Sequence, residues 1–326
     1  GCSIFRDGWG PLTTKQHAPE SSDREALERE IAAEQIFVDR AYTSLEQLRA
    51  DYREMQRSIE SEGAWGSPQA RTERDAKAAH FGDQAMRLEQ IEDRLVFGRI
   101  DMTDNQAHYI GRAGLPDEAG GRLLIDWRAP AARPFYQATA ANPEGVVRRR
   151  HIATSNRKVR SIEDDALDTA TAPQRGLVFQ GEGALMSALA SGRDGRMGDI
   201  VATIQSEQDS IIRAPGRGVL VVQGGPGTGK TAVALHRAAY LLYADRKRLE
   251  RSGVLIVGPS RVFLKYIEQV LPSLGESGVV SLTMGELVPG ITATINDPPD
   301  VAHAKGKLAW IETLRAAVRD LQRLPK

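Results

Sequence analysis

Residues 224–231 read GGPGTGKT, which matches the spacing of side chains in loops that bind nucleotide phosphates. Glycines at these places permit positive φ angles and close backbone approach, so that N–H groups can wrap phosphate oxygens at the start of a helix. Lys230 is expected to reach the β- and γ-phosphates, and the hydroxyl of Thr231 is expected to hold Mg²⁺. The alternative, a turn that is glycine-rich by accident, would require eight chance matches. The sequence therefore predicts binding of ATP or GTP.

The elements that must position this loop follow from the apolar pattern around it. A buried strand is expected at residues 219–222, directly before the loop, and a helix from the loop through Tyr243. A helix from about residue 199 to 213 precedes that strand. Further elements are expected in the order strand 254–257, helix 262–274 and strand 279–282. Strands alternating with helices around such a loop predict a parallel α/β core of the RecA kind.

The N-terminal part of the chain predicts a helical hairpin. Ser22 and Glu25 have the spacing of a capping box, and apolar residues then recur at steps of three and four, as in a coiled-coil seam. Two glycines break the pattern at residues 62–68, where Ser67 and Pro68 are suited to start a second helix. Helices of roughly 39 and 29 residues would form an antiparallel arm projecting about 40 to 60 Å. The alternative is that the pair packs back on the body as a scaffold.

Three residues at the expected tip of this arm are candidates for contact with a partner. They are Glu60, Glu62 and Trp65. An acidic pair beside an exposed aromatic ring suits a protein surface, whereas a solvated loop is the plain alternative.

Between the arm and the phosphate loop the pattern changes to short strands. Candidate strands are residues 97–101, 108–112, 122–127 and 145–147. Asp126 ends an apolar run as a Walker B acid does, but Trp127 follows it in place of a second acid, so Asp126 is expected to be structural.

A basic cluster follows the last of these candidate strands. Arg148, Arg149, Arg150 and His151, with Arg157, Lys158 and Arg160, could bind phosphates of nucleic acid or an acidic protein surface. Glu163, Asp164, Asp165 and Asp168 could instead neutralise the cluster within the fold.

Composition limits the class of protein. The 326 residues suggest about two domains, and 43 basic residues balance 43 acidic ones, so the chain has no global attraction to nucleic acid. The single cysteine, Cys2, excludes an internal disulfide framework and fits a reducing cytosol, although it could also mark a lipidated N-terminus. No apolar stretch reaches the roughly 18 residues of a membrane span. We therefore expect a cytoplasmic protein without membrane contact.

The fold class predicted is mixed α/β, with a helical coiled-coil hairpin, a small β-rich module and a partial RecA-like domain with a parallel sheet. The expected parts are a flexible lead-in (1–21), the arm (22–96), the β-rich module (97–190), the nucleotide-binding domain (191–290) and the start of an insertion (291–326). Because the first residue is Gly and the chain ends on a helical pattern, we expect it to be part of a longer polypeptide.

The order of Gln208, the phosphate loop and His236-Arg237 in the following helix resembles UvrD-type superfamily 1 helicases. In that family a glutamine at the matching distance reads adenine, which implies selectivity for ATP and gives this role to Gln208, with Gln205 the weaker candidate. The resemblance to this first RecA domain adds Arg237 to the site.

Longer blocks resemble a narrower family, the RNA polymerase-associated HelD-type ATPases. The blocks are YIGRAGLPDE (109–118), LLIDWRAPAARPFYQATAANPEGVVRRRHI (123–152) and VLIVGPSRVFLKYIEQVLPSLGE (254–276), and the resemblance covers most of residues 23–290. It implies that the arm at 22–96 enters the secondary channel of bacterial RNA polymerase core. It also implies that ATP-linked rearrangement releases the polymerase from nucleic acid, so that the protein is nucleoid-associated through its partner.

Two departures from the UvrD pattern bear on activity. Residues 258–261 read GPSR where UvrD helicases carry an aromatic motif that contacts single-stranded DNA, which argues against strand tracking. No Walker B Asp-Glu pair follows the phosphate loop, so this chain alone is expected to hydrolyse little ATP. Contact with nucleic acid is expected to be indirect. A DNA helicase and a non-catalytic scaffold remain the alternatives to a polymerase-recycling ATPase.

The resulting set of site residues is small. Lys230 and Thr231 are the expected catalytic residues, and Thr231 is the expected Mg²⁺ ligand. The residues expected to bind ATP are Gln208, Gly225, Pro226, Gly227, Thr228, Gly229, Lys230, Thr231 and Arg237.

Overall fold

The computed structural model describes residues 21–62, 67–91, 93–167, 200–268, 279–291 and 295–321, together with Val270 and Leu274. Trp65, Asp168 and the linker expected at 181–198 lie outside the described residues, as does the lead-in up to residue 20. The chain divides into two compact units, one formed by residues 1–254 and 266–279 and the other by residues 255–265 and 280–326.

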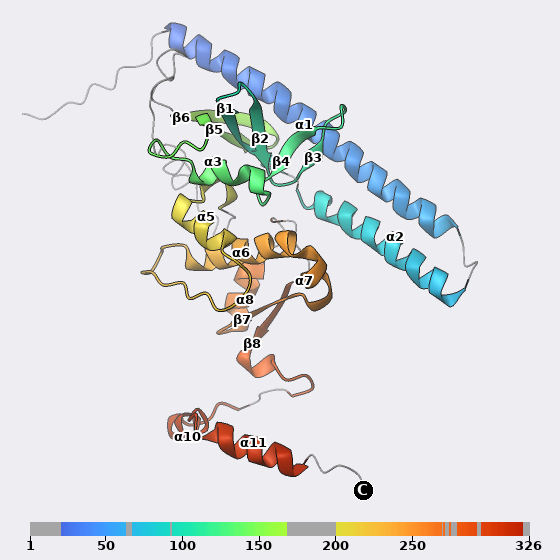
Figure 1. The fold of residues 1–326 in the computed structure, drawn as a ribbon, viewed down its shortest axis with the longest axis vertical. Coiled ribbons are helices and arrows are strands. Elements are labelled where there is room, and N and C mark those ends of the chain that lie inside the picture. The colour runs from blue at the N-terminus through green and yellow to red at the C-terminus, as the bar shows by residue number, and fades with distance from the viewer. Residues whose placement is uncertain are drawn as a thin grey trace, which may run out of the picture. The chain divides into compact units, whose positions relative to one another are not determined.

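The first unit begins with the helical hairpin that the sequence predicts. Helix α1 spans Ser21–Ser61 and helix α2 spans Pro68–Glu89, and the two lie side by side over the second half of α1 (Figure 1). Ser67 is the N-cap of α2, because its hydroxyl accepts a hydrogen bond of 3.2 Å from the backbone N–H of Ala70. The expected hairpin is therefore confirmed, with a second helix shorter than expected.

A six-stranded mixed sheet follows the hairpin. Its strands are β1 (Val96–Met102), β2 (Ala107–Gly111), β3 (Leu115–Pro116), β4 (Arg122–Asp126), β5 (Val146–Ser155) and β6 (Lys158–Ala166). They lie in the order β3-β4-β2-β1-β5-β6, and β2 pairs with β4 in parallel while the other neighbours are antiparallel. The sheet confirms the expected strands 97–101, 108–112 and 122–127. It also contains β6, which was not expected because its charged sequence, KVRSIEDDA, does not show the alternation of apolar and polar residues that marks a strand.

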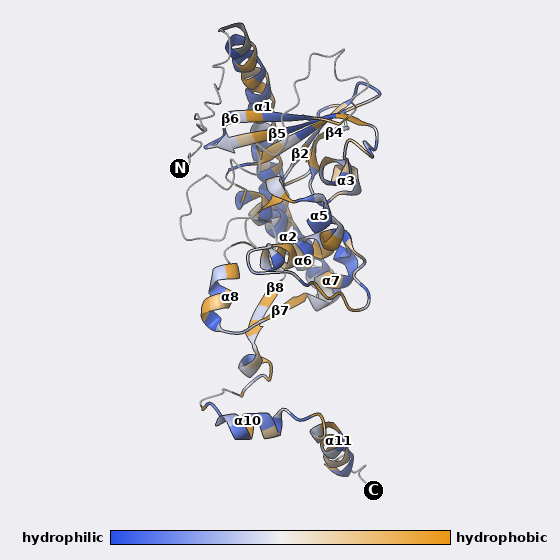
Figure 2. Ribbon diagram, turned by 90° about the vertical axis from the view of Figure 1, so that its left-hand side faces the viewer, coloured by the Kyte–Doolittle hydropathy of each residue, from blue (hydrophilic) through white to orange (hydrophobic). Residues whose placement is uncertain are grey.

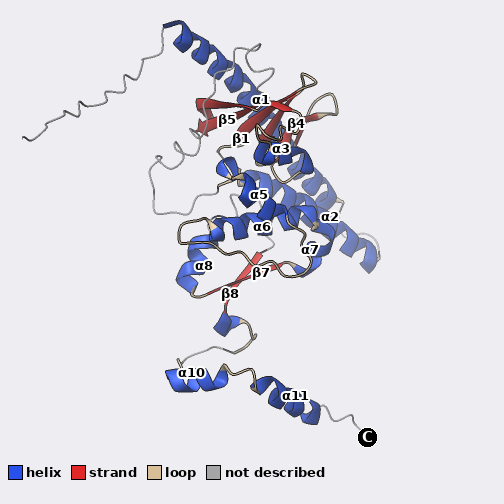
Figure 3. Cartoon of the chain, turned by 60° about the vertical axis from the view of Figure 1, so that its left-hand side comes forward, coloured by secondary structure: helices blue, strands red, loops and turns tan. Residues whose placement is uncertain are grey.

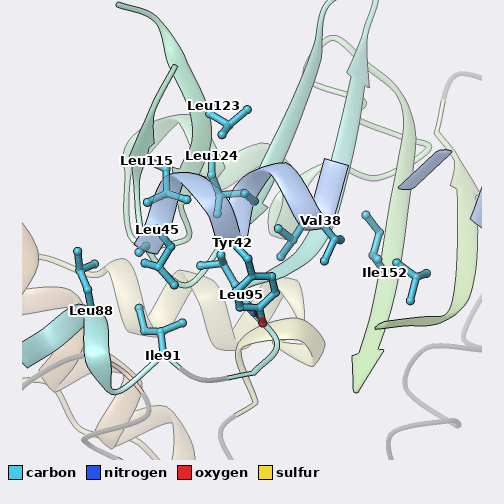
Figure 4. Packing of buried hydrophobic residues seen from close by; sticks show 14 residues of the cluster. Val38, Tyr42, Leu45, Leu88, Ile91, Leu95, Leu115, Leu123, Leu124 and Ile152 are labelled. Atoms are coloured by element: carbon cyan, nitrogen blue, oxygen red, sulfur yellow. Dashed lines mark hydrogen bonds between the residues drawn. The ribbon is translucent and has the colours of Figure 1, made fainter. Parts of the chain in front are cut away.

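One hydrophobic core joins the hairpin to the sheet. Val38, Tyr42 and Leu45 of α1 are buried against side chains of the sheet such as Leu124 and Ile152 (Figure 4). The expected boundary at residue 96 thus does not coincide with a break in packing. The first half of α1 is a scaffold for the sheet, and beyond Tyr52 the helix contacts α2, for example through the ion pair of Arg53 with Glu89 at 2.8 Å. Both hydrophilic and hydrophobic residues occur along the part of α1 that Figure 2 leaves in view.

The basic cluster is neutralised within the fold. The β5–β6 register sets Arg149 opposite Asp165 and Arg150 opposite Asp164, with ion-pair distances of 2.9 and 2.6 Å. Arg150 is 3% exposed and also pairs with Glu34 of α1, itself 1% exposed. The hypothesis that this cluster binds nucleic acid is therefore wrong for Arg148, Arg149 and Arg150, whose charges hold α1 and the two strands together.

Further described helices lie between β4 and β5 and on both sides of the phosphate loop. They are η1 (Pro130–Ala132), α3 (Arg133–Gln137), η3 (Val201–Thr203), α5 (Ser206–Arg213), α6 (Lys230–Ala244) and α7 (Arg246–Ser252). Helix α3 contacts both β1 and α5, so it lies between the sheet and the helices that flank the phosphate loop (Figure 3).

The strand expected at residues 219–222 is not formed. Val219 is 93% exposed and Val221 is 73% exposed, and no strand among the described residues pairs with this segment. A strand depends on neighbours for its backbone hydrogen bonds. High β-propensity alone therefore does not make these four residues a strand.

The remaining described elements belong wholly or in part to the second unit. They are β7 (Val254–Gly258), α8 (Arg261–Glu268), β8 (Val279–Thr283), η4 (Met284–Glu286), α10 (Pro299–Lys305) and α11 (Trp310–Leu321), and β7 pairs with β8. Ser260 starts α8, since its hydroxyl accepts a 3.2 Å hydrogen bond from the N–H of Phe263. Arg261 pairs with Glu286 at 2.7 Å. The GPSR segment thus begins a helix and fixes it to the residues after β8.

None of the helices described here is long and apolar enough to cross a membrane.

Candidate functional site

The phosphate loop, residues 224–231, leads directly into α6. Gly227 and Gly229 have φ angles of 78° and 81°, in the left-handed region that other residues rarely adopt, and Gly229 is the N-cap of the helix. The Lys230 ammonium donates hydrogen bonds of 2.8 and 2.7 Å to the carbonyls of Gly224 and Gly225. The hydroxyl of Thr228 donates a 2.9 Å bond to the carbonyl of Gly225 as well. The loop is thus folded around its own lysine.

Such a loop fits a phosphate group. The first backbone N–H groups of a helix have no partner within it, and the helix dipole adds positive potential at the same end. Since α6 is 15 residues long and starts at Lys230, its N-terminus adds this potential beside the lysine charge. Lys230 is exposed and Thr231 is half-buried, so both hydroxyl and ammonium can be reached by a ligand.

Gln208 lies against this loop although it is 21 residues away from Gly229 along the chain. A Cβ placed on Gly229 would stand 3.2 Å from Nε2 of Gln208, so no residue larger than glycine fits there without displacing the amide. The other end of the same amide is engaged at the start of α5, where Oε1 of Gln208 accepts a 3.1 Å bond from the N–H of Gln205. The structure therefore brings the expected adenine reader and the phosphate loop together.

The structure gives Gln205 the N-cap position of α5. Its side chain accepts from the backbone N–H of Gln208, which completes a reciprocal capping box. This bond occupies Gln205 in starting the helix and leaves Gln208 as the glutamine beside the loop.

Arg237 points away from the phosphate loop toward the end of α5. Its guanidinium donates bonds of 3.0, 3.1 and 2.7 Å to the carbonyls of Ile211, Ile212 and Ala214, and one of 2.9 Å to Pro215. These carbonyls lie at and just after the C-terminal end of α5, where a cation is favourable. Burial lowers the pKa of Arg237 below its ordinary value. Its visible role is to hold α5 to α6.

A buried ion pair fixes α5 to the segment that follows β4. Asp209 is fully buried and is paired with Arg213 at 2.8 Å. Arg213 also donates to the backbone carbonyls of Trp127, Arg128 and Ala129 at 2.7, 3.1 and 3.3 Å. The sequence did not single out this pair, although the spacing of four residues on a short helix was visible.

The amide of Gln137 extends this network to α3. Its Nε2 donates a 2.7 Å bond to Asp209 Oδ2. Gln137 ends α3, which contacts β1 of the sheet, so Asp209 is held from its own helix and from the sheet side at once.

His236 gives α6 a second contact with the segment after β4. It is fully buried, its Nδ1 lies 2.7 Å from the carbonyl of Ala232, and its Nε2 accepts a 3.2 Å bond from the N–H of Ile200. Nδ1 therefore carries the proton. Its ring meets that of Trp127 edge-on with centroids 5.8 Å apart. His236 is a core residue and not a ligand.

Three other residues considered from the sequence have contacts outside the phosphate loop or are exposed. Asp126 is buried and pairs with Arg128 at 2.7 Å, which confirms the structural role expected for it. Glu60 is exposed near the end of α1 and accepts a 2.9 Å bond from Gln56, and Glu62 is exposed just after the helix.

The structure thus has a helical hairpin rooted in a mixed sheet and a phosphate-loop sequence at the head of α6, which define a mixed α/β protein. Residues 31–176 match the family model described as DNA helicase IV HelD, N-terminal domain, so this part of the chain is similar to that domain. No curated protein matches the chain. The phosphate loop lies outside the matched residues.

Proposed function

We propose that this chain is the N-terminal part of an ATP-dependent factor that binds bacterial RNA polymerase core and helps to release it from nucleic acid. The observation that carries the proposal is the HelD N-terminal domain at residues 31–176, followed by a phosphate loop with Gln208 beside it. In this proposal Lys230 neutralises the β- and γ-phosphates, Thr231 holds Mg²⁺ and Gln208 reads adenine.

The hairpin is the part that would enter the secondary channel. Support comes from its construction, since α1 continues beyond the shared core and pairs there with α2, where Arg53 meets Glu89 at 2.8 Å. Glu60 and Glu62 are exposed at that end, so two carboxylates are available to a basic or metal-containing site of the partner.

The arm is tested with full chains that differ only in charge at the tip. Glu60→Lys with Glu62→Lys is expected to weaken binding to RNA polymerase core at least 10-fold, measured by biolayer interferometry. The matched control is Glu25→Lys with Glu54→Lys, two exposed acids of α1 that lie farther from the tip. Equal affinity of the tip variant and the control would refute the arm assignment.

The nucleotide site is tested separately with Lys230→Ala. This variant is expected to lose ATP binding and ATP-dependent release of polymerase while it keeps the affinity of the arm for polymerase. Release that proceeds normally without Lys230 would favour a scaffold over an ATPase.

A second candidate function is a DNA helicase, and the description of the matched family favours it. Against it stands the GPSR segment, in which Ser260 and Arg261 are engaged in starting and fixing α8. ATP turnover that single-stranded DNA stimulates strongly, together with unwinding, would decide for the helicase.

A further inference from the structure

The position of Gln208 depends on a helix of only eight residues. Helix α5 carries Gln208 in its first turn, and the Nε2 atom of Gln208 lies 3.2 Å from the place that a Cβ on Gly229 would take. A helix of two turns has too few internal hydrogen bonds to be stable alone, so packing against its neighbours must fix it. The contacts of α5 with the rest of the fold therefore decide where the Gln208 amide lies.

One of these contacts reaches Asp209, the residue next to Gln208. The Nε2 of Gln137 donates a 2.7 Å hydrogen bond to Oδ2 of Asp209, and the Oε1 of Gln137 accepts a 3.3 Å bond from Arg133. A carboxylate only accepts hydrogen bonds and a guanidinium only donates them, so these two partners permit one orientation of the amide. Gln137 therefore holds α5 through a bond of defined direction.

Helix α3, which carries Gln137, is itself fixed to the sheet. The ring of Phe135 lies so close to Gly98 of β1 that a Cβ on this glycine would stand 2.3 Å from it. Arg149 of β5 donates bonds of 3.1 and 3.2 Å to the carbonyls of Phe135 and Ala138, in and just after α3. The sheet therefore sets the place of α3, and with it the place of Gln137.

Strand β5 joins these contacts to the root of the arm. Successive side chains of a strand point to opposite faces of its sheet. Arg150, the residue after Arg149, pairs with the buried Glu34 of α1 at 2.8 Å. The two neighbouring arginines therefore hold α1 on one face of the sheet and α3 on the other.

The contacts thus form a continuous series from α1 through β5 and α3 to the residue next to Gln208. Their side chains are buried or half-buried, where a hydrogen bond is stronger than on a wet surface. We propose that Gln137 is a positioning residue of the nucleotide site: through Asp209 it sets the place of the Gln208 amide relative to Gly229. The reading of adenine by Gln208 rests on the proposed function, whereas the positioning of its amide does not.

The positioning is tested first without any nucleotide. In the isotope-labelled full chain, NMR records the side-chain amide resonances of Gln208 and the backbone amide resonance of Gly229. We expect Gln137→Leu to shift both, because α5 loses its bond to α3. Gly227, which has open space around it, should keep its resonance.

The matched control is Gln56→Leu, the same substitution in the arm. Gln56 is also half-buried, and its amide likewise accepts a bond from an arginine, Arg53 at 3.4 Å, and donates one to a carboxylate, Glu60 at 2.9 Å. This variant should leave the resonances of Gln208 and Gly229 unchanged. Unshifted resonances in Gln137→Leu, or equal shifts in the two variants, would overturn the positioning role.

Nucleotide affinities then measure the consequence. In Gln137→Leu the preference for ATP over GTP should fall about 3- to 10-fold, while the affinity for tripolyphosphate, which has no base, should stay within about twofold. Equal weakening of all three ligands would show a general loss of structure and would contradict the proposal. If Gln137→Leu shifts the resonances but the unaltered chain binds ATP and GTP equally, the adenine role of Gln208 fails and the positioning of its amide stands.

An exchange of donor and acceptor tests the bond itself. Gln137→Glu places a carboxylate against Asp209 and should lower the preference for ATP at least as much as Gln137→Leu. Adding Asp209→Asn provides an amide that can donate to the new carboxylate, so the double variant should recover most of the preference. A double variant that melts at the temperature of the unaltered chain but recovers no preference would refute a role for this bond.

Discussion

Arg213 Nε lies 2.8 Å from Oδ1 and 3.0 Å from Oδ2 of Asp209, and Asp209 has no exposed surface. The same guanidinium donates to three carbonyls after β4. A single buried arginine therefore fixes the helix that carries Gln208 to the domain that carries the arm.

Replacing Arg213 by Met should destabilise the chain by about 3 to 5 kcal/mol, because it leaves the Asp209 carboxylate buried without its cation. Adding Asp209→Asn should recover part of this loss, and urea denaturation of the four chains in a double-mutant cycle measures the coupling. Arg217→Gln, at an exposed position just after α5, is the control and should change stability by less than about 0.5 kcal/mol. Additive effects of the two substitutions would contradict a coupled pair.

Gln208→Ala should reduce the preference for ATP over GTP, because the amide beside Gly229 would no longer read the base. The matched variant is Gln205→Ala, which breaks the same capping box at a cost of about 1 kcal/mol but leaves the amide of Gln208 in place. Dissociation constants for both nucleotides, measured by fluorescence titration, separate the two effects. If Gln205→Ala alters the ATP-to-GTP ratio as much as Gln208→Ala, Gln208 has no role in reading the base.

Gly229→Ala and Gly227→Ala should differ although both residues have positive φ angles. Each carries the backbone strain of about 1 to 2 kcal/mol that a side chain meets in the left-handed region. Only the methyl group at 229 would also contact Gln208, at 3.2 Å, while the space around Gly227 is open. We expect melting temperature to fall in both variants and ATP affinity to fall further in Gly229→Ala. Equal ATP affinities of the two variants would show that the contact between residue 229 and Gln208 does not affect ATP binding.

Stability should fall between about pH 10 and pH 12, with Tyr109 contributing. Burial, followed by the charge of Glu34, raises the pKa of Tyr109 from its ordinary value of 10.0 to about 12. The folded chain therefore holds this proton more tightly than the unfolded chain. The contribution is fully present below pH 10 and is lost as pH rises through 12.

Tyr109→Phe provides the test, since it keeps the ring that stacks on Phe37 and removes the proton. The fall in unfolding free energy between pH 9.5 and pH 11.5 should become smaller by about 1 to 2 kcal/mol. Tyr42, Tyr136 and Tyr243 also have raised pKa values, so part of the decline should remain. An unchanged slope would contradict the burial of the Tyr109 hydroxyl.

The sequence predicted those elements whose signals are local. Ser67 and Pro68 marked the start of α2, and glycines marked the turn before α6, because caps and left-handed turns depend on a few adjacent residues. The place of Gln208 beside the loop followed from the family resemblance alone. That contact joins residues far apart in the chain.

What could not be predicted depends on pairing over long distances. The acids that neutralise Arg150 come from α1 and β6, and whether a charged segment faces solvent or a counter-charge is decided by register. The same limit explains residues 219–222, whose apolar composition is typical of a strand but supplies no partner. Asp209 and Arg213 looked like an ordinary surface pair, because a spacing of four residues on a helix does not show whether the two side chains are buried.

The rooting of α1 in the shared core has a mechanical consequence. The helix is continuous from Ser21 to Ser61, and Val38 to Leu45 are locked in the sheet while the last nine residues extend about 14 Å beyond Tyr52. Helix α1 is therefore a cantilever: it is fixed in the sheet and has no break in the helix where it leaves the core. A load applied at the tip would reach the sheet as a bending moment instead of being absorbed by a flexible joint.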